Sequence, residues 1–398
     1  MNILQVTLGF YPAQGWGGPV KVVHQNGREL VRRGHNVTVY CSNLISKREK
    51  IQPGTFERQM DGMRIVYFDA LNFKWWPGTL GPIWLPDLPA YLKRELAQFD
   101  VVHINGYRSP MILPIAQAAR RAGIPIITQP HGALPVIVNS QGLKRLYDRV
   151  FGQMELDGIS ALLALQESER QQALAHGIPN ERIVILPNGI DPAEREHVPP
   201  PGTMRRRWNL PPDAPVILFL GRINKKKGPD MLVEAFAQSK IPNAHLVIAG
   251  PDDGMLSEVL ALIEKHNLTA RVRLPGLLTG PDVLAAFQDA DLFVLPCRAD
   301  TFPVVIMESC LMGTPMLITD RCEIAPLVEN RIGDVVPFDT QTFAAAMDAL
   351  LTNRAKYAAY RANCAQALAD TFSIQAVADQ LEKIYQDAIE EKRHAQPA

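Results

Sequence analysis

Residues 216–228 have the sequence Val-Ile-Leu-Phe-Leu-Gly-Arg-Ile-Asn-Lys-Lys-Lys-Gly. The first five residues are apolar, which is typical of a strand that is buried on both faces. A glycine and a cluster of cations follow this run directly, and a helical pattern comes after them. A buried strand, a polar loop and a helix in this order indicate one repeat of a parallel α/β sheet.

The same repeat occurs throughout the chain. Helical patterns such as 19–33, 87–97 and 111–122 separate short apolar runs. The strands expected in the first part of the chain are 3–8, 37–41, 63–68, 101–104, 125–128, 161–166 and 183–186. A Pro-rich break at 198–202 comes next. The strands expected after it are 216–220, 245–249, 272–274, 292–295, 315–319 and 334–336.

A chain of 398 residues is too long for one ordinary hydrophobic core. We therefore predict an α/β fold with two doubly wound, Rossmann-like domains, at 1–195 and 196–372. Residues 374–393 carry the apolar stripe of one amphipathic helix. We therefore expect 373–398 to form a separate C-terminal segment.

The composition is that of an ordinary globular protein, with 47% hydrophobic residues, 21% charged residues and a formal net charge of zero. Zero net charge produces no overall field that favours nucleic acid. Residues 1–195 carry 21 Lys and Arg against 16 Asp and Glu, and this balance of +5 weakly favours an anionic partner.

The five cysteines are widely spaced and include no C-x-x-C, which is typical of free thiols in a reducing compartment. The N-terminus lacks the basic region of a signal peptide. No apolar run approaches the roughly 20 residues that span a bilayer. These features predict a cytoplasmic protein.

Open parallel sheets bind ligands at the carboxyl ends of their strands, so the loops after strands are candidate sites. In the loop after 216–220, Arg222 and Lys227 are suited to a diphosphate group, which carries about two negative charges. The alternative is a solvated basic loop, and we expect the side chains of Lys225 and Lys226 to be mostly solvated.

The loop after 292–295 contains Asp300 and leads into a helix that contains Glu308. One carboxylate suits the hydroxyls of a sugar and the other suits a ribose. The start of the helix offers backbone groups suited to phosphate at Phe302, Pro303, Val304 and Val305. The alternative for Asp300 is a simple capping residue.

Three further strand ends hold candidate residues. His131 follows 125–128 and can exchange protons near neutral pH or offset phosphate when charged; the alternative is a histidine satisfied by backbone. Gly17 and Gly18 allow the backbone to approach a ligand, although glycine pairs also form flexible turns. Asn188 follows 183–186 and, with the next glycine, is by itself only a turn signal.

Two acidic pairs have the composition of metal ligands, and we expect neither to bind metal. Asp289 and Asp291 precede a strand, which is the wrong end for a ligand, and we interpret them as the end of a helix. Asp252 and Asp253 follow a strand, but two adjacent side chains make a poor metal site.

Together these motifs resemble the family 4 retaining glycosyltransferases, a bacterial polysaccharide-type class of group 1 glycosyl transferases with the GT-B fold. The resemblance covers essentially the whole chain. It depends on the order of these motifs: Gly17-Gly18, Gly34 to Val39, His131-Gly132, Pro187 to Asp191, Gly221-Arg222, Lys227-Gly228, Ala249-Gly250, and Asp300 to Glu308 leading into Gly313-Thr314-Pro315.

The resemblance implies two domains that face a cleft: an acceptor-side domain at 1–195 and a nucleotide-sugar-binding domain at 196–372. The final helix is expected to return to the first domain. The family needs neither a metal nor a cofactor, and it transfers the sugar with retention by front-face displacement.

Residue roles follow from the same resemblance. Glu308 matches the glutamate that contacts the donor ribose, and Asp300 the acid that contacts the donor sugar. Arg222 and Lys227 match the pair that holds the diphosphate, and His131 matches a histidine near the reaction centre. The other positions matched to the donor site are Gly17, Gly18, Asn188, Gly250, Leu277, Phe302, Pro303, Val304 and Val305.

Two residues depart from the family pattern. The family usually has glutamate where this chain has Asp300, so the carboxylate is one methylene closer to the backbone. It usually has glycine where this chain has Pro303, which removes one amide donor. The spacing to Glu308 is kept, so the expected effect is on sugar specificity and on the level of activity.

The expected function is transfer of a hexose from a UDP- or GDP-linked donor to a glycan or lipid-linked acceptor in surface polysaccharide biosynthesis. The Trp- and Pro-rich segment 73–86 is a candidate for contact with the acceptor or with the inner face of the membrane, or else an ordinary packed loop. The alternatives are a nucleotide-sugar epimerase and a non-catalytic nucleotide-sugar-binding protein.

Overall fold

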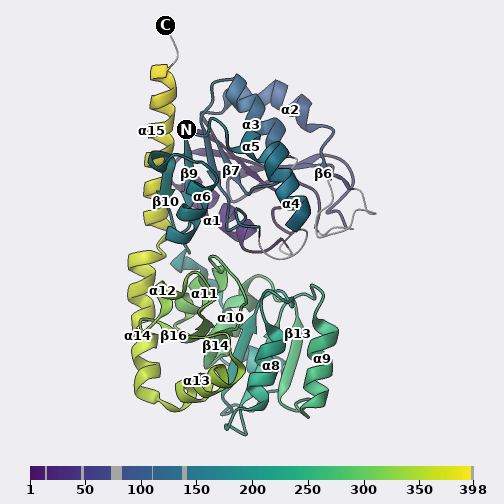
Figure 1. Ribbon diagram of the computed structural model, residues 1–398, viewed down its shortest axis with the longest axis vertical. Coiled ribbons are helices and arrows are strands. Elements are labelled where there is room, and N and C mark those ends of the chain that lie inside the picture. Colours follow the sequence, from purple (N-terminus) through teal and green to yellow (C-terminus); the bar gives the residue numbers. More distant parts are fainter. Residues whose placement is uncertain (14–15, 46–48, 73–82, 110, 137–140, 396–398) are drawn as a thin grey trace. The chain divides into compact units, whose positions relative to one another are not determined.

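The computed structural model describes residues 1–395 except for 14–15, 46–48, 73–82, 110 and 137–140. Backbone contacts divide the chain into two compact units. The N-terminal unit comprises Met1–Gly189 together with Ile374–Ala398, and the C-terminal unit comprises Ile190–Ser373. Each unit contains a largely parallel sheet that is packed against helices (Figure 1).

The N-terminal unit is built on an eight-stranded sheet with the order β10-β9-β8-β7-β1-β2-β4-β3. Every neighbouring pair is parallel except β3 with β4. The strands are β1 (Asn2–Thr7), β2 (Asn36–Ser42), β3 (Phe56–Met60), β4 (Met63–Phe68), β7 (Val101–Asn105), β8 (Ile126–Gln129), β9 (Ala161–Ala164) and β10 (Ile183–Ile185). A separate antiparallel pair consists of β5 (Leu71–Asn72) and β6 (Ile83–Trp84).

Helices cover both faces of this sheet. On one face, α1 (Gly18–Arg32) and α15 (Ile374–Ala395) bury side chains such as Leu30 and Tyr385. On the other face, α2 (Leu88–Glu95) and α3 (Ile112–Arg121) bury apolar side chains against a second core cluster. The remaining helical elements are η2 (Leu96–Gln98), α4 (Gln141–Tyr147), the π-helical turn η3 (Asp148–Gly152), α5 (Gln153–Leu156), α6 (Glu167–Ala175) and η4 (Asn180–Arg182).

The C-terminal helix α15 is an integral part of the N-terminal unit. Arg33, at the end of α1, lies 2.6 Å from Asp379 and 2.8 Å from Glu382. The buried hydroxyl of Tyr385 lies 2.6 Å from Nδ1 of His103 in β7. The last segment of the chain therefore completes the core of the first unit.

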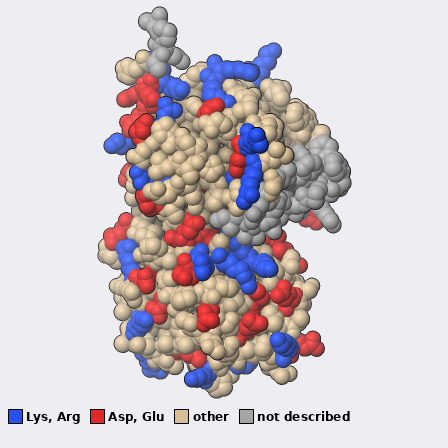
Figure 2. Space-filling view, viewed as in Figure 1, with Lys and Arg blue, Asp and Glu red and all other residues tan. Residues whose placement is uncertain are grey.

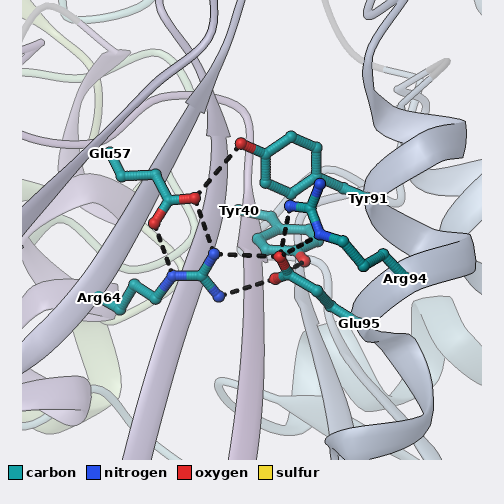
Figure 3. A network of polar contacts seen from close by, with 6 residues as sticks. All are labelled: Tyr40, Glu57, Arg64, Tyr91, Arg94 and Glu95. Atoms are coloured by element: carbon teal, nitrogen blue, oxygen red, sulfur yellow. Dashed lines mark hydrogen bonds and ion pairs between the residues drawn. The ribbon is translucent and has the colours of Figure 1, made fainter.

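The edge strand β3 is not among the strands expected from the sequence, because it lacks an apolar run. Arg64 of β4 holds it in place through two hydrogen bonds of 2.7 Å to Glu57, and it also contacts Glu95 of α2 at 2.7 Å (Figure 3). Burial raises the pKa of Glu95, but hydrogen bonds from Arg64 and Arg94 outweigh it and lower the pKa to about 2. Paired charges thus add to the apolar contacts that Phe56 and Met60, at the two ends of β3, make with the core.

The C-terminal unit has a six-stranded sheet of entirely parallel pairs, in the order β13-β12-β11-β14-β15-β16. Its strands are β11 (Val216–Leu220), β12 (His245–Ala249), β13 (Val272–Gly276), β14 (Leu292–Leu295), β15 (Met316–Thr319) and β16 (Gly333–Val336). Its helical elements are η5 (Pro192–His197), α7 (Thr203–Arg207), α8 (Pro229–Ala237), α9 (Leu256–Lys265), α10 (Pro281–Asp289), α11 (Val304–Met312), α12 (Ala325–Val328), α13 (Thr340–Thr352) and α14 (Arg354–Thr371).

Each strand expected from the sequence is present, with bounds that differ from the prediction by at most two residues. The units divide between Gly189 and Ile190, before the Pro-rich break at 198–202. The reason is that Ile190 pairs with Ser373 and donates its amide to the carbonyl of Phe372 at 2.8 Å. The chain therefore enters and leaves the C-terminal unit at adjacent positions. All five cysteines are buried free thiols.

Candidate active-site residues and family

The C-terminal unit has a topological switch point between β11 and β14. From β11 the chain continues to β12 and β13 on one side, and from β14 it continues to β15 and β16 on the other. Open sheets bind ligands at the carboxyl ends of such a pair of strands. The loops 221–228 and 296–303 follow these two strands.

Lys227 and Asp300 form an ion pair across this switch point. Their side chains are 15% and 14% exposed. Burial lowers the pKa of Lys227, but the charge of Asp300 and the hydrogen bond to it, together with the neighbouring thiols, outweigh this effect, so the pKa is raised. Burial raises the pKa of Asp300, whereas the charges of Lys227 and Lys226 lower it below its ordinary value. Both groups therefore carry full charges at neutral pH.

Asp300 is thus not the capping residue that the sequence left as an alternative, because α11 has no side-chain cap. Lys225 is exposed as predicted, but Lys226 is only half-exposed and its charge acts on Asp300. The expectation that Lys226 is mostly solvated is wrong, since the loop folds toward β14.

Arg222 is 46% exposed and lies 3.1 Å from Oδ2 of Asp253. The same carboxylate accepts a hydrogen bond of 2.8 Å from Asn224. This contact uses one of the five donors of the guanidinium group. Arg222 therefore presents a fork of hydrogen-bond donors at the end of β11, next to the loop that follows β12.

Arg298 supports the basic loop and was missed by the sequence analysis. Its guanidinium lies 2.8 Å and 2.6 Å from the two carboxylate oxygens of Asp230. It also donates to the carbonyl of Lys225 at 2.8 Å, and its amide donates to the carbonyl of Lys226 at 2.7 Å. No local pattern in the sequence distinguishes this arginine, because its role depends on which strands are neighbours.

Two glycines allow the loops at the switch point to pack closely. A Cβ atom on Gly250 would lie 1.8 Å from the carbonyl oxygen of Gly221, and one on Gly228 would lie 2.0 Å from that of Pro296. Gly250 has a φ of 150° and Gly228 one of 70°. The predicted donor residue Gly250 therefore has a packing role that is independent of any ligand.

The helix α11 begins at Val304, and Pro303 is its N-cap. The first-turn amides of Val304 and Val305 are at a helix N-terminus, which favours anions. Glu308 lies one turn further along and is 5% exposed. The ring of Phe302 is buried 6.1 Å from that of Phe372, so only its main chain is available to a ligand.

The remaining predicted residue of this unit, Leu277, follows β13 and is 50% exposed. An exposed apolar side chain at a strand end is available to stack on a planar ligand group. Leu277 follows β13. This strand pairs with β12, and β12 in turn pairs with β11.

Both acidic pairs have structural partners. Asp289, the last residue of α10, accepts hydrogen bonds from the amides of Gly202 and Met204, and Asp291 pairs with Arg205 at 2.8 Å. Asp252 accepts hydrogen bonds from the amides of residues 254–256. Within the described ranges, no group of three His, Cys, Asp or Glu residues is arranged to hold a metal ion.

In the N-terminal unit the switch point lies between β1 and β7, and His131 follows β8, which neighbours β7. His131 adopts a left-handed backbone with a φ of 53°, and Gly132 follows with a φ of 75°. This conformation costs a non-glycine residue about 1–2 kcal/mol. Glu169 of α6 holds the turn by accepting the amide of Gly132 at 2.6 Å.

The imidazole of His131 is positioned by Asn105 at the end of β7. Nε2 of His131 lies 3.1 Å from Oδ1 of Asn105, whose amide nitrogen donates to Gln5 at 3.0 Å. Since the amide nitrogen is used, the oxygen accepts, and Nε2 of His131 carries the proton. Nδ1 is then left as an acceptor.

Burial lowers the pKa of His131 to about 3. The imidazole is therefore neutral near pH 7, the state in which Nδ1 can accept a proton or a hydrogen bond. Because Nε2 donates to Asn105, the neutral imidazole offers Nδ1 as a hydrogen-bond acceptor to a ligand group.

Gly17 and Gly18 lie at the start of α1, where Gly17 has a φ of 90° and open space around its Cβ position. The preceding Trp16 donates to the carbonyl of Leu44 at 2.8 Å and packs over Gly9. The loop is thus anchored by its tryptophan while its glycines remain accessible.

Asn188 follows β10 and is 3% exposed. Its Oδ1 atom has no hydrogen-bond partner among the residues that the structure describes. An unsatisfied buried acceptor is costly, so it is a position where a ligand donor or a water is expected.

Solved structures share the fold of this chain. HepE from Anabaena, in complex with UDP and glucose, superposes with a TM-score of 0.77 and 18% identity over 97% of this chain and 100% of that one. Sucrose-phosphate synthase from Thermosynechococcus elongatus gives a TM-score of 0.75 and 19% identity over 98% and 100%. The fold is the GT-B fold of nucleotide-sugar-dependent glycosyltransferases.

Family models match both units: "Glycosyl transferase 4-like domain" matches residues 17–189, and "Glycosyl transferases group 1" matches residues 202–367. The chain belongs to this glycosyltransferase family and is a transferase, which confirms the resemblance. D-inositol 3-phosphate glycosyltransferase from Mycobacterium avium is 26% identical over 400 residues, covering 96% of this chain and 91% of that protein. A protein of the same name from Catenulispora acidiphila is 27% identical, covering 77% and 76%.

No helix in the described part of the chain is long and apolar enough to cross a membrane. Residues 73–82, which include most of the Trp- and Pro-rich segment, lie outside the described residues. The flanking residues Leu71 and Trp84 pair across β5 and β6 and are 49% and 61% exposed.

Proposed function

We propose that this enzyme transfers a hexose, with retention of configuration and without a metal, from a UDP- or GDP-linked donor. The observation that supports this proposal most strongly is the cluster of Lys227, Asp300 and Arg222 on the loops that follow β11 and β14 and flank the switch point. Lys227 and Arg222 carry positive charge where the resemblance places the donor diphosphate. No cofactor is required by this chemistry.

In this proposal the leaving diphosphate is stabilised by protein cations. Lys227 is held in place by Asp300, and Arg222 has donors free of other described residues apart from its contact with Asp253. Such preorganised charges act at the oxygen where negative charge develops. The amides of Val304 and Val305 add donors at a helix N-terminus, Leu277 meets the base, and Glu308 accepts hydroxyls of the ribose.

The shorter carboxylate of Asp300 is proposed to change which donor hydroxyls it reaches. Because it is already paired with Lys227, it orients that cation as well as contacting the sugar. Pro303 has no amide, so phosphate recognition at α11 relies on the two following residues. These differences favour an altered sugar preference.

The N-terminal unit is proposed to bind the acceptor. Its neutral His131 offers Nδ1 as an acceptor to an uncharged hydroxyl, since Nε2 donates to Asn105. Gly17, Gly18 and Asn188 follow other strands of the same sheet. We propose a glycan or lipid-linked acceptor in surface polysaccharide assembly, at the inner face of the membrane. The exposed apolar pair Leu71 and Trp84 supports a peripheral membrane contact.

A second acceptor class is favoured by the curated relatives, whose names specify D-inositol 3-phosphate. A soluble phosphorylated polyol would need no membrane. The basic balance of residues 1–195 is compatible with such an anionic acceptor.

The test is a transfer assay with UDP- and GDP-linked hexoses, offered with a bacterial lipid extract, with soluble glycans and with D-inositol 3-phosphate. The expected result is acceptor-dependent release of one nucleoside diphosphate and a product with the donor's anomeric configuration by NMR. Conversion of the donor sugar without an acceptor would indicate an epimerase. Donor binding with no turnover on any acceptor would indicate a binding protein.

A further inference from the structure

Residues Gln141–Leu156 form one continuous helical segment, through α4, η3 and α5. Its exposed large apolar side chains are Leu146 (57%), Val150 (50%), Phe151 (40%) and Met154 (38%). These are four of the nine exposed large apolar side chains among the described residues, yet they fall within nine consecutive positions. Such clustering distinguishes this surface from the scattered apolar residues of an ordinary surface.

The exposed residues form two adjacent ridges. Leu146, Val150 and Met154 are spaced by four residues, so they lie along one side of the helical segment. Arg145 and Arg149 have the same spacing one position earlier, and both are exposed. An apolar ridge therefore runs beside a basic ridge, and we name this surface the outer helix face.

The acidic residues of the segment are used on its inner side. Asp148 pairs with Arg108 at 2.7 Å, and the buried Glu155 accepts the amide of Arg108 at 2.9 Å and the hydroxyl of Tyr147. Arg145 and Arg149 form no ion pair with any described residue. Lys and Arg side chains gather over this part of the N-terminal unit beside uncharged surface (Figure 2). The outer helix face is therefore apolar and positively charged.

We propose that the outer helix face docks onto a membrane that contains anionic lipids. Its apolar ridge would enter the boundary between headgroups and acyl chains, while Arg145 and Arg149 bind lipid phosphates. A second copy of this chain is disfavoured as the occupant, because a symmetric contact would bring the arginines of both copies together. This inference rests on the proposed membrane-linked acceptor and names the surface that meets the membrane.

The segment that carries the outer helix face is connected to the His131 turn through Arg108. Arg108 donates to the carbonyls of Ala133 and Leu134, directly after the His131 turn, and also to Asp148 of η3. One arginine thus ties the docking segment to the acceptor-side histidine. A docked enzyme would hold this turn close to lipid headgroups, where a lipid-linked acceptor presents its sugar.

The test is flotation of the full chain with phosphatidylcholine vesicles, with and without phosphatidylglycerol. The wild type is expected to float only with the anionic vesicles. The variants Arg145→Glu/Arg149→Glu and Leu146→Ser/Val150→Ser should each weaken vesicle binding about tenfold or more. Matched controls are Arg206→Glu and Leu260→Ser, which change exposed residues of the C-terminal unit and should float like the wild type.

Three results would overturn the inference. They are no flotation of the wild type, flotation of the wild type that is the same with and without phosphatidylglycerol, or flotation of both double variants that equals that of the wild type. A concentration-dependent dimer that Leu146→Ser/Val150→Ser abolishes, without vesicle binding, would assign the face to self-association instead. Thermal stabilisation by nucleotide is measured on the same proteins. If that response persists while flotation is absent, the docking inference alone fails, and the proposed function stands.

Discussion

Nε2 of His131 donates to Oδ1 of Asn105 across 3.1 Å, and Asn105 is held in turn by Gln5. This chain of contacts joins three neighbouring strands, β1, β7 and β8, at their carboxyl ends. It fixes which imidazole nitrogen carries the proton, so the side chain facing the proposed acceptor has a defined donor and a defined acceptor.

Asn105→Ala is expected to lower kcat/KM about tenfold, because a hydrogen bond that fixes the imidazole is worth about 1.4 kcal/mol. Asn105→Asp should instead raise the pKa of His131, because a carboxylate favours the imidazolium. The measurement is the pH profile of kcat/KM for both variants. An Asn105→Asp profile identical to that of the wild type would show that Asn105 does not position His131.

Acid should destabilise the N-terminal unit through two histidines that are neutral in the folded protein. Burial lowers the pKa of both His103 and His131 to about 3, below the ordinary value of 6.5. Between these pH values the unfolded chain binds protons that the folded chain does not, so stability falls as the pH decreases from 6.5 toward 3. The loss approaches about 1.4 kcal/mol per pH unit for each histidine.

This dependence is measured as the thermal midpoint at pH 7, 6 and 5. His103→Gln keeps a polar partner for Tyr385 but removes one titrating group, so its midpoint should change less steeply with pH. Equal slopes for the wild type and His103→Gln would contradict the buried neutral state of His103.

Arg222→Ala should lower turnover about 100-fold with little effect on folding. The side chain is 46% exposed and has one contact of 3.1 Å with Asp253, so its loss should change stability by less than about 0.5 kcal/mol. The lost turnover reflects one missing donor at the leaving diphosphate. Arg206→Ala, which also removes an exposed arginine of the C-terminal unit, is the matched control. Normal turnover in a folded Arg222→Ala enzyme would remove this residue from the mechanism.

Lys227→Ala should cost both stability and turnover, because it leaves the charge of Asp300 unpaired in a largely buried position. The expected loss of stability is about 3 kcal/mol. The double variant Lys227→Met/Asp300→Asn removes both charges and should regain much of that stability. Turnover should stay about 100-fold or more below the wild type in both variants. Recovery of turnover in the double variant would show that the pair is structural only.

The sequence was sufficient to predict the sheets, because their central strands are apolar runs. The edge strand β3 was not predicted, because only its end residues Phe56 and Met60 are apolar and the charged residues between them include Glu57, which pairs with Arg64. The glycosyltransferase family was also predictable, from the order of the motifs.

The site was predictable only as far as strand ends locate it. The partnerships of Lys227 with Asp300 and of His131 with Asn105 depend on strand order, which no local pattern contains. The same holds for the support that Arg298 gives to the basic loop. The charge state of His131 depends on its surroundings in the folded unit, so the sequence alone could not assign it.

The most direct test of donor binding at the Lys227–Asp300 switch point is thermal stabilisation by UDP, GDP, ADP and their sugar conjugates. It should be measured for the wild type and for Lys227→Met/Asp300→Asn. A ligand at about 100 times its Kd should add about 2.7 kcal/mol of stability. We predict that nucleotides of one base stabilise the wild type and that the double variant loses this response. Stabilisation by no nucleotide, or an equal response in the double variant, would contradict the assignment.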